Sequence, residues 1–197
     1  IVNNSGFDLM LVGSGISMSD SPDDIAATRY RTSFYNRYFK RFKAPESWFY
    51  PGALLKDKTK MFIARSNCDV GVFINRNFVK ATNTLVVISS EEDLFLLDYT
   101  RTLLKPTHGS VGIVAKMSTT TPGHDQILKE LWDFVSSIPQ TQLLPDKDLT
   151  PGLFNSYNFM LIGYNTWNDV SEHRKEALQK MPSTLILNKN KRSSSDN

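Results

Sequence analysis

Short runs of apolar residues recur along this 197-residue chain, and most are four or five residues long. Runs this apolar on both faces are typical of strands in a parallel sheet that is covered on each side. Leucines at helical spacings lie between them, from Glu91 to Leu104, where Ser89, Ser90 and Glu92 supply start signals, and from Asp125 to Ile138. The alternation predicts an α/β fold of βαβ units with a parallel sheet. The predicted strands are Leu9–Val12, Val70–Ile74, Thr84–Ile88, Val111–Ala115, Phe159–Ile162 and Thr184–Leu187.

Two parts of the chain resemble each other. Asp8–Gly13 is similar to Asn158–Gly163, and Cys68–Asn75 is similar to Pro182–Asn188. In both parts a polar residue precedes an apolar strand and a glycine, a helical segment follows, and a second strand ends in Asn. Any two βα units share some of this pattern, but the matching order favours an internal repeat.

The repeat predicts an unequal division of the chain. Residues 82–189 contain enough elements for a complete doubly wound domain of four or five strands. Residues 1–80 hold only the closing strand–helix–strand of a similar domain, with an insertion at 17–51. Two strands and a helix bury too little to fold alone, so preceding chain, the second domain or another subunit must complete this part. Residues 190–197 form a polar tail that we expect to be disordered.

Composition narrows the range of functions. The net charge of +3 gives no strong field that points to nucleic acid. Cys68 is the single cysteine, which excludes an internal disulfide and fits a reducing compartment. The apolar runs are far shorter than the roughly 20 residues of a membrane-spanning helix, and no signal peptide is visible. Because the chain begins at Ile1 without Met, we expect a piece of a longer protein whose remainder could span a membrane.

Candidate chemistry is sparse. Gly13–Ser14–Gly15 follows a predicted strand at its carboxyl end, where open α/β sheets bind ligands and where glycine allows a phosphate to approach. The glycine-rich fingerprint is incomplete because Met18 stands where a third glycine belongs, so a tight βα turn is favoured over a nucleotide site. The histidines lack partners at metal-ligand spacing, and Cys68 is expected to be packed rather than nucleophilic. We therefore predict neither a metal nor a catalytic residue.

The most unusual surface feature is a basic-aromatic segment, Ile25–Ala44, which carries six basic residues, six aromatics and no acid. On a helix the aromatics gather over about half of the circumference. The rings can pack on their own domain while the arginines stay hydrated, or the segment can dock on an anionic membrane or a partner, or it can bind nucleic acid. The first two interpretations are favoured over the third. The candidate interaction residues are Arg29, Phe34, Arg37, Tyr38, Lys40, Arg41 and Phe42.

Residues Asn67–Phe78 (NCDVGVFINRNF) resemble a junction inside the cytosolic C-terminal region of eukaryotic cation/proton exchangers, the plant CHX exchangers and their fungal potassium/proton antiporter relatives. In that family a Cys-x-Val-Gly strand ends in Asp-Arg-Gly, and a new strand, here Thr84–Ile88, opens a second domain. The family's Asp-Leu-hydrophobic-Val-Gly strand is matched at Asp8–Gly13 and less closely at Asn158–Gly163.

This resemblance implies tandem Rossmann-like domains similar to universal stress proteins. ATP-binding members of that superfamily carry Gly-x2-Gly-x9-Gly-[Ser/Thr] after the fourth strand. Here Ile16 stands three residues after Gly13, and Gly52 is displaced by the insertion and followed by Ala53. ATP binding is therefore not expected, and its candidate residues, were it to occur, are Gly13, Ser14, Gly15 and Gly52.

The function that the resemblance implies is regulatory and not enzymatic. The chain would be the cytosolic regulatory domain of a monovalent cation (potassium)/proton antiporter, controlling or assembling the membrane transport domain of the same polypeptide. It would form a homodimer and lie at the cytosolic face of a membrane, in the Golgi or another endomembrane. The alternatives are a free-standing nucleotide-binding universal stress protein and an RNA-binding module that uses the basic-aromatic segment.

Overall fold

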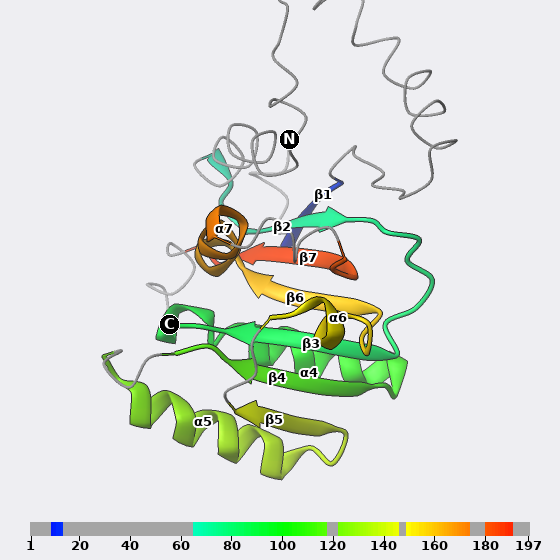
Figure 1. Ribbon diagram of the computed structural model, residues 1–197. Helices are drawn as coiled ribbons and strands as arrows, with labels where there is room; N and C mark the ends of the chain where they lie inside the picture. The colour runs from blue at the N-terminus through cyan, green and yellow to red at the C-terminus, as the bar shows by residue number, and fades with distance from the viewer. Residues whose placement is uncertain (1–8, 14–64, 118–121, 146–148, 174–179, 191–197) are drawn as a thin grey trace, which may run out of the picture.

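A computed structural model describes residues 9–13, 65–117, 122–145, 149–173 and 180–190 of the chain. It contains seven strands that belong to one sheet (Figure 1). The strands are β1 (Leu9–Gly13), β2 (Asp69–Ile74), β3 (Asn83–Ile88), β4 (Ser110–Ala115), β5 (Thr141–Pro145), β6 (Phe159–Gly163) and β7 (Ser183–Asn188).

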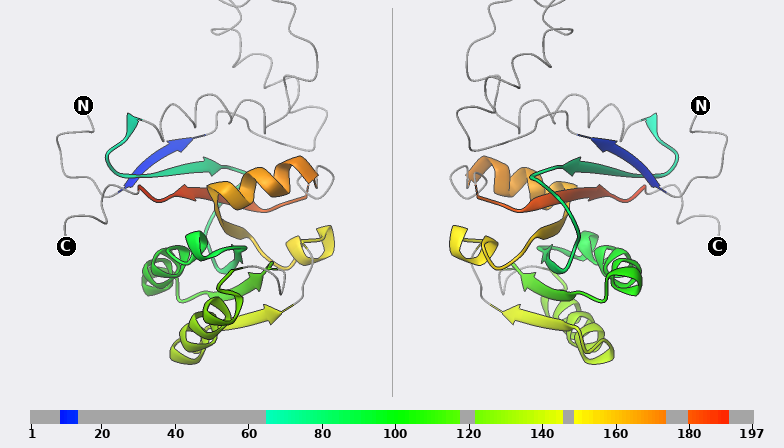
Figure 2. Two further views of the ribbon diagram at one scale, coloured as in Figure 1. Left: turned by 90° about the vertical axis from the view of Figure 1, so that its left-hand side faces the viewer. Right: turned by 90° about the vertical axis from the view of Figure 1, so that its right-hand side faces the viewer.

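Helices cover both faces of the sheet (Figure 2). The longer pair packs on one face over an apolar cluster, and the shorter pair packs on the other face over a second cluster. The backbone at the ends of the longer helices is left-handed, at Gly123 (φ 72°) and at His108 (φ 48°). The first face carries α4 (Leu96–Thr107) and α5 (His124–Ser137), preceded by a 3-10 turn η3 (Glu91–Asp93), and the second carries α6 (Pro151–Phe154) and α7 (Tyr164–His173).

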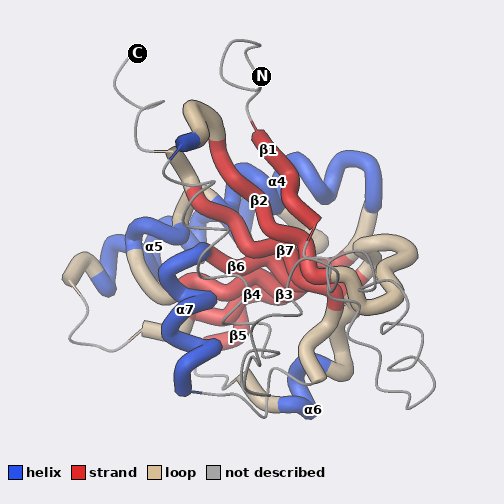
Figure 3. The backbone as a smooth tube through the Cα atoms, turned by 90° about the horizontal axis from the view of Figure 1, so that it is seen from above, coloured by secondary structure: helices blue, strands red, loops and turns tan. Residues whose placement is uncertain are grey.

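The sheet order is β1-β2-β7-β6-β3-β4-β5, which Figure 1 shows from top to bottom, and Figure 3 shows the same twisted strands from above. Strands β7, β6, β3, β4 and β5 run parallel to one another, with β3 in the middle of this set. The residues Leu85 to Ile88 of β3 are completely buried, because helices cover both of its faces. The predicted α/β fold and the central position of Thr84–Ile88 among parallel neighbours are confirmed.

One pairing differs from the prediction of an all-parallel sheet. β2 pairs with β7 in the antiparallel sense, with Val72 opposite Ile186. The apolar pattern of Val70–Ile74 predicts a buried strand but contains no information on the direction of its neighbour, which follows from how the two parts of the chain meet. The second part of the chain thereby completes one edge of the β1–β2 pair.

The antiparallel pairing relates the two halves of the internal repeat by a local two-fold axis. β1 and β6 correspond, and so do β2 and β7, since both pairs are parallel and have matching registers. In the β2–β7 pair, Val70 lies opposite Asn188 and Ile74 lies opposite Thr184, so the axis passes between Val72 and Ile186. The repeat seen in the sequence is thus a spatial repeat.

Three further differences concern element bounds. Strand β5 was not predicted, because Thr141 and Gln142 are polar and only two apolar residues remain in its pattern. The helix expected from Glu91 begins as α4 at Leu96, after the 3-10 turn. Asn190 was assigned to a disordered tail, yet its backbone N–H donates to Asp69 Oδ1 at 2.7 Å.

The rest of the tail, 191–197, lies outside the described residues, as does the insertion at 17–51. Within the described ranges, no helix combines the length and the hydropathy needed to cross a bilayer.

Candidate functional site

The strand order reverses at β3, which makes its carboxyl end the expected ligand position in a doubly wound sheet. β3 continues to β4 on one side, whereas β6 and β7 are added on the other. In open α/β sheets, ligands bind in the crevice where neighbouring connections leave in opposite directions. The residues at this switch point are the Ser89–Asp93 turn after β3 and the Gly163–Thr166 junction between β6 and α7.

A buried carboxylate occupies the switch point. Asp93 is 2% exposed, and its Oδ2 accepts hydrogen bonds from Ser89 N at 2.9 Å, from Ser89 Oγ at 3.1 Å and from Thr166 Oγ1 at 2.6 Å. Ser89 Oγ and Thr166 Oγ1 also lie within hydrogen-bond distance of each other, but a hydroxyl that donates to this contact does not donate to Asp93 at the same time. Three donors compensate for the removal of the carboxylate from water. This network joins the end of β3 to the start of α7.

Gly163 is required beside this carboxylate. A Cβ atom at Gly163 would collide with Asp93 Oδ1. In nucleotide-binding sheets, glycine in a βα turn lets the backbone approach a phosphate. Here the glycine instead makes room for a carboxylate of the protein itself, and a negative charge at that point opposes an incoming phosphate.

A groove of about 760 Å³ opens next to the switch point, between η3, α4, α5 and the carboxyl end of β7. Its lining contains six carboxylates and two cations, Arg101 and Lys189. Arg101 contacts Asp98 at 3.3 Å and lies 5.2 Å from the centre of the Phe134 ring. The carboxylates are Glu91, Glu92, Asp93, Asp98, Glu130 and Asp133.

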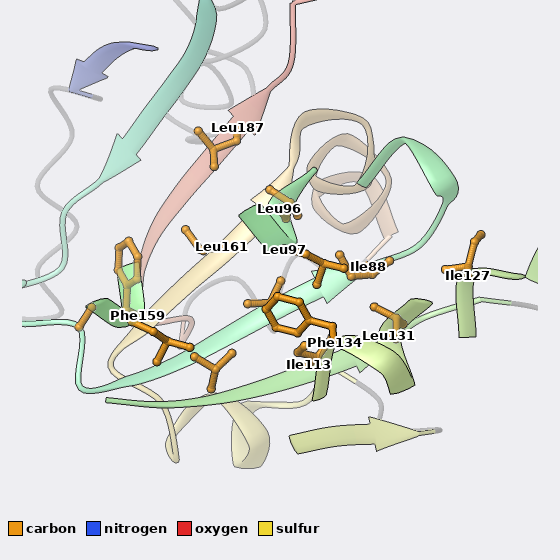
Figure 4. Packing of buried hydrophobic residues seen from close by; sticks show 14 residues of the cluster. Ile88, Leu96, Leu97, Ile113, Ile127, Leu131, Phe134, Phe159, Leu161 and Leu187 are labelled. Atoms are coloured by element: carbon orange, nitrogen blue, oxygen red, sulfur yellow. The ribbon is translucent and has the colours of Figure 1, made fainter. Parts of the chain in front are cut away.

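The floor of the groove is apolar. Leu97 of α4, Phe134 of α5 and Leu187 of β7 line it and belong to the core cluster on this face (Figure 4). An acidic rim above an apolar floor suits a cationic, partly apolar partner better than an anionic one. Within the described residues, no group of three His, Cys, Asp or Glu side chains is placed to hold a metal ion.

Most of the residues that the sequence nominates lie outside the described part of the chain. Gly13 is the last residue of β1, opposite Phe73 of β2. Ser14, Gly15 and Gly52 are outside the described residues. The same holds for all seven interaction candidates of the basic-aromatic segment, Arg29, Phe34, Arg37, Tyr38, Lys40, Arg41 and Phe42.

The residues at the switch point were not nominated from the sequence. Ser89 was interpreted as a helix start signal, and neither Asp93 nor Thr166 was assigned to a binding or catalytic site. Their position in the sequence could have indicated them. The hydroxyls of Ser89 and Thr166 and the carboxylate of Asp93 all follow the carboxyl ends of buried strands that the apolar pattern locates. Their pairing across 73 residues depends on β3 and β6 being neighbours.

Cys68 was expected to be packed, and this is confirmed. It is 7% exposed and precedes β2 directly. Its Sγ lies 3.1 Å from Ser66 Oγ, which also donates to the Cys68 carbonyl at 3.0 Å. These contacts place the thiol inside a local turn.

Comparison with known proteins yields a fold likeness only. No family model matches the sequence, and no curated protein matches it. One similar solved structure is a universal stress protein from Archaeoglobus fulgidus DSM 4304, with 10% sequence identity and a TM-score of 0.46. The match covers 94% of this chain and 88% of that chain. At this identity and TM-score the likeness assigns the chain to no family.

Proposed function

We propose that this chain is a regulatory domain that works by packing against other protein, and that it belongs to the cytosolic part of a monovalent cation (potassium)/proton antiporter. The observation that carries the proposal is the β2–β7 pairing. The β1–β2 pair, which repeats the β6–β7 pair, is joined to it across a local two-fold axis. This is the arrangement expected of two consecutive domains of one regulatory region.

The position of the resembling motif supports the same proposal. Asn67–Phe78, which resembles the exchanger junction, includes β2 and leads into the connection to β3. It therefore lies where the two halves of the repeat meet, which supports an equivalence with the junction of the exchangers.

The chemistry of the groove supports binding to protein rather than to nucleotide. Its carboxylates outnumber its cations, and Asp93 fills the position that a phosphate would approach. Transport would then take place in a membrane domain of the same polypeptide, and this chain would bias that domain through its own packing state. The proposed assembly is a homodimer at the cytosolic face of a membrane.

The test is the physical form of the protein in its source cells. An antibody against the 197-residue chain is used to probe membrane and soluble fractions, before and after carbonate extraction. The proposal expects an integral membrane antigen much larger than the 22.4 kDa of this chain, with the epitope open to protease from the cytosolic side. A soluble antigen of 22 kDa would overturn it, and micromolar ATP binding or salt-dependent RNA binding by that antigen would establish one of the two alternatives.

A further inference from the structure

The two halves of the internal repeat have the same pairing but different surroundings. Leu9 opposite Asp69 in β1–β2 corresponds to Phe159 opposite Ser183 in β6–β7, and these are the first of five consecutive register pairs in each. β6 has a second neighbour, β3, on its other edge, and all five of its residues are buried. Among the described strands β1 has no second neighbour and forms the end of the sheet.

The side chains of β1 are more exposed than their counterparts in β6. Leu11 of β1 is 62% exposed, whereas Leu161, which corresponds to it in β6, is 2% exposed. Leu9, Met10 and Val12 are partly exposed as well. A stretch of four apolar residues with none buried is unusual, because apolar surface of this kind is normally removed from water by packing or by binding.

We propose that the edge of β1 that no described strand covers binds a strand supplied from outside this chain, which runs parallel to β1 and is apolar on both faces. The repeat itself specifies this partner. In the complete half, the equivalent edge of β6 is covered by β3, which is parallel to it and carries the sequence Asn83–Ile88.

The register of the incoming strand follows from the same comparison. Thr84 lies opposite Phe159, and the pairing continues to Val87 opposite Ile162. Transferred to the first half, four residues of the partner strand lie opposite Leu9–Val12. Main-chain hydrogen bonds along this edge would provide affinity, and side chains on alternate faces would provide specificity.

The partner must be apolar on both faces because β1 offers no charge for a polar partner to meet. Its sequence is Leu-Met-Leu-Val-Gly. On one face the Leu11 side chain lies over Gly71, where a Cβ atom would come within 2.8 Å of Leu11 Cδ2. In the complete half, the four β3 residues opposite Phe159–Ile162 are at most 2% exposed.

Two features argue for a strand rather than for open solvent at this edge. β1 contains none of the residues that protect exposed edges, such as Lys or Pro. The edge is also unsuited to a second copy of β1, because a two-fold axis would make two β1 strands antiparallel, whereas the repeat requires a parallel neighbour. The proposal concerns the edge of β1 and does not depend on the antiporter assignment.

The test uses a fluorescent peptide with the sequence Thr82–Ser90, extended by lysines for solubility, and the whole 197-residue protein. Binding is measured by anisotropy, and hydrogen exchange monitors the amides of Leu9–Val12. We expect saturable binding, protection of these amides, and about a tenfold or greater loss of affinity when alternate peptide nitrogens are methylated. Leu11→Lys should weaken binding similarly, and Val79→Lys, at an apolar residue that is 93% exposed, should not.

A spin label at either end of the peptide determines the direction. The label at the peptide's amino end should broaden the signal of Leu9 more than that of Val12, and the label at the carboxyl end should do the reverse. The opposite pattern would overturn the proposal, as would the absence of binding or equal binding of the methylated peptide. A protein that is dimeric by ultracentrifugation, with Leu9–Val12 already protected, would also overturn it and would identify β1 as a contact between copies.

Discussion

Val72 of β2 and Ile186 of β7 lie opposite each other in the antiparallel pair, and each is the counterpart of the other in the internal repeat. Each is 2% exposed, and both belong to the core cluster beneath α7. The seam between the two halves of the repeat is therefore part of the hydrophobic core. An apolar seam of this kind is stabilised by the removal of its side chains from water.

Removing volume at the seam should destabilise the whole protein. Ile186→Ala should lower the free energy of unfolding by about 2–5 kcal/mol, because it deletes buried methyl groups and leaves a cavity. Ile186→Val should cost only about 0.5–1.5 kcal/mol. Urea unfolding followed by circular dichroism measures both. The control is Val79→Ala at a side chain that is 93% exposed, which should stay within about 0.5 kcal/mol.

A larger residue at the switch point should be poorly tolerated. Gly163→Ala places a methyl group against Asp93 Oδ1 and should reduce stability by about 1–3 kcal/mol, since the carboxylate is held by three hydrogen bonds and cannot move freely. Thermal unfolding measures the loss. Gly152→Ala is the matched control, because the nearest atom to its added Cβ is Thr150 Oγ1 at 3.8 Å. Equal melting of the two variants would contradict the close approach described for Gly163.

The hydroxyl of Thr166 should contribute more than that of an ordinary buried threonine. Thr166→Val leaves Asp93 without one donor and should cost about 1.5–3 kcal/mol, because the acceptor is charged. Thr184 is also fully buried, but its hydroxyl donates to the neutral Pro182 carbonyl, so Thr184→Val should cost about 0.5–1.5 kcal/mol. Thr166→Ser retains the donor and should recover most of the loss. Chemical denaturation of the three variants makes the comparison.

Cys68 should react slowly with thiol reagents in the folded protein. Its burial and its contact with Ser66 Oγ mean that a reagent reaches the sulfur only when the segment before β2 opens. The labelling rate at neutral pH should increase by orders of magnitude in denaturant and approach that of free cysteine. A rate in buffer equal to that of free cysteine would show that the thiol is open.

The basic-aromatic segment remains a prediction, because Ile25–Ala44 lies outside the described residues. Replacing Phe34, Tyr38 and Phe42 together by Ser should destabilise the protein or its assembly, since each buried ring contributes about 1.5–3 kcal/mol. Replacing Arg37, Lys40 and the other basic residues by Gln should leave melting unchanged and should reduce binding to anionic vesicles at low salt. An aromatic triple variant that melts and assembles like the parent would rule out the packing and docking interpretations.

Nucleotide binding at Gly13–Ser14–Gly15 is also untested, because two of its three residues are not described. The incomplete fingerprint predicts no ATP binding by equilibrium dialysis at micromolar concentration, since a phosphate cradle needs several converging N–H groups. Binding that Gly15→Val abolishes would show that the incomplete motif suffices.

The apolar pattern located the strands well because both faces of β3, β4 and β6 are buried. The side chains of an apolar run such as Leu85–Ile88 are removed from water on both faces only if helices cover both sides of the strand. The segment alone therefore predicts two covering layers. The helix at His124–Ser137 was equally visible, because Ile127, Leu131 and Phe134 repeat at helical spacing and face one side. The edge strand β5 was missed because an edge needs less burial and tolerates polar residues.

The chain's local pattern therefore determined which segments are strands and helices and that two of its parts repeat. Tertiary structure alone decided that β2 meets β7 in the antiparallel sense, that Asp93 reaches Thr166 across the switch point, and that β1 is left at the edge. The reason is physical. The spacing of apolar and polar residues is a property of the local sequence, whereas strand direction and contacts across 73 residues depend on which surfaces pack together after the elements have formed.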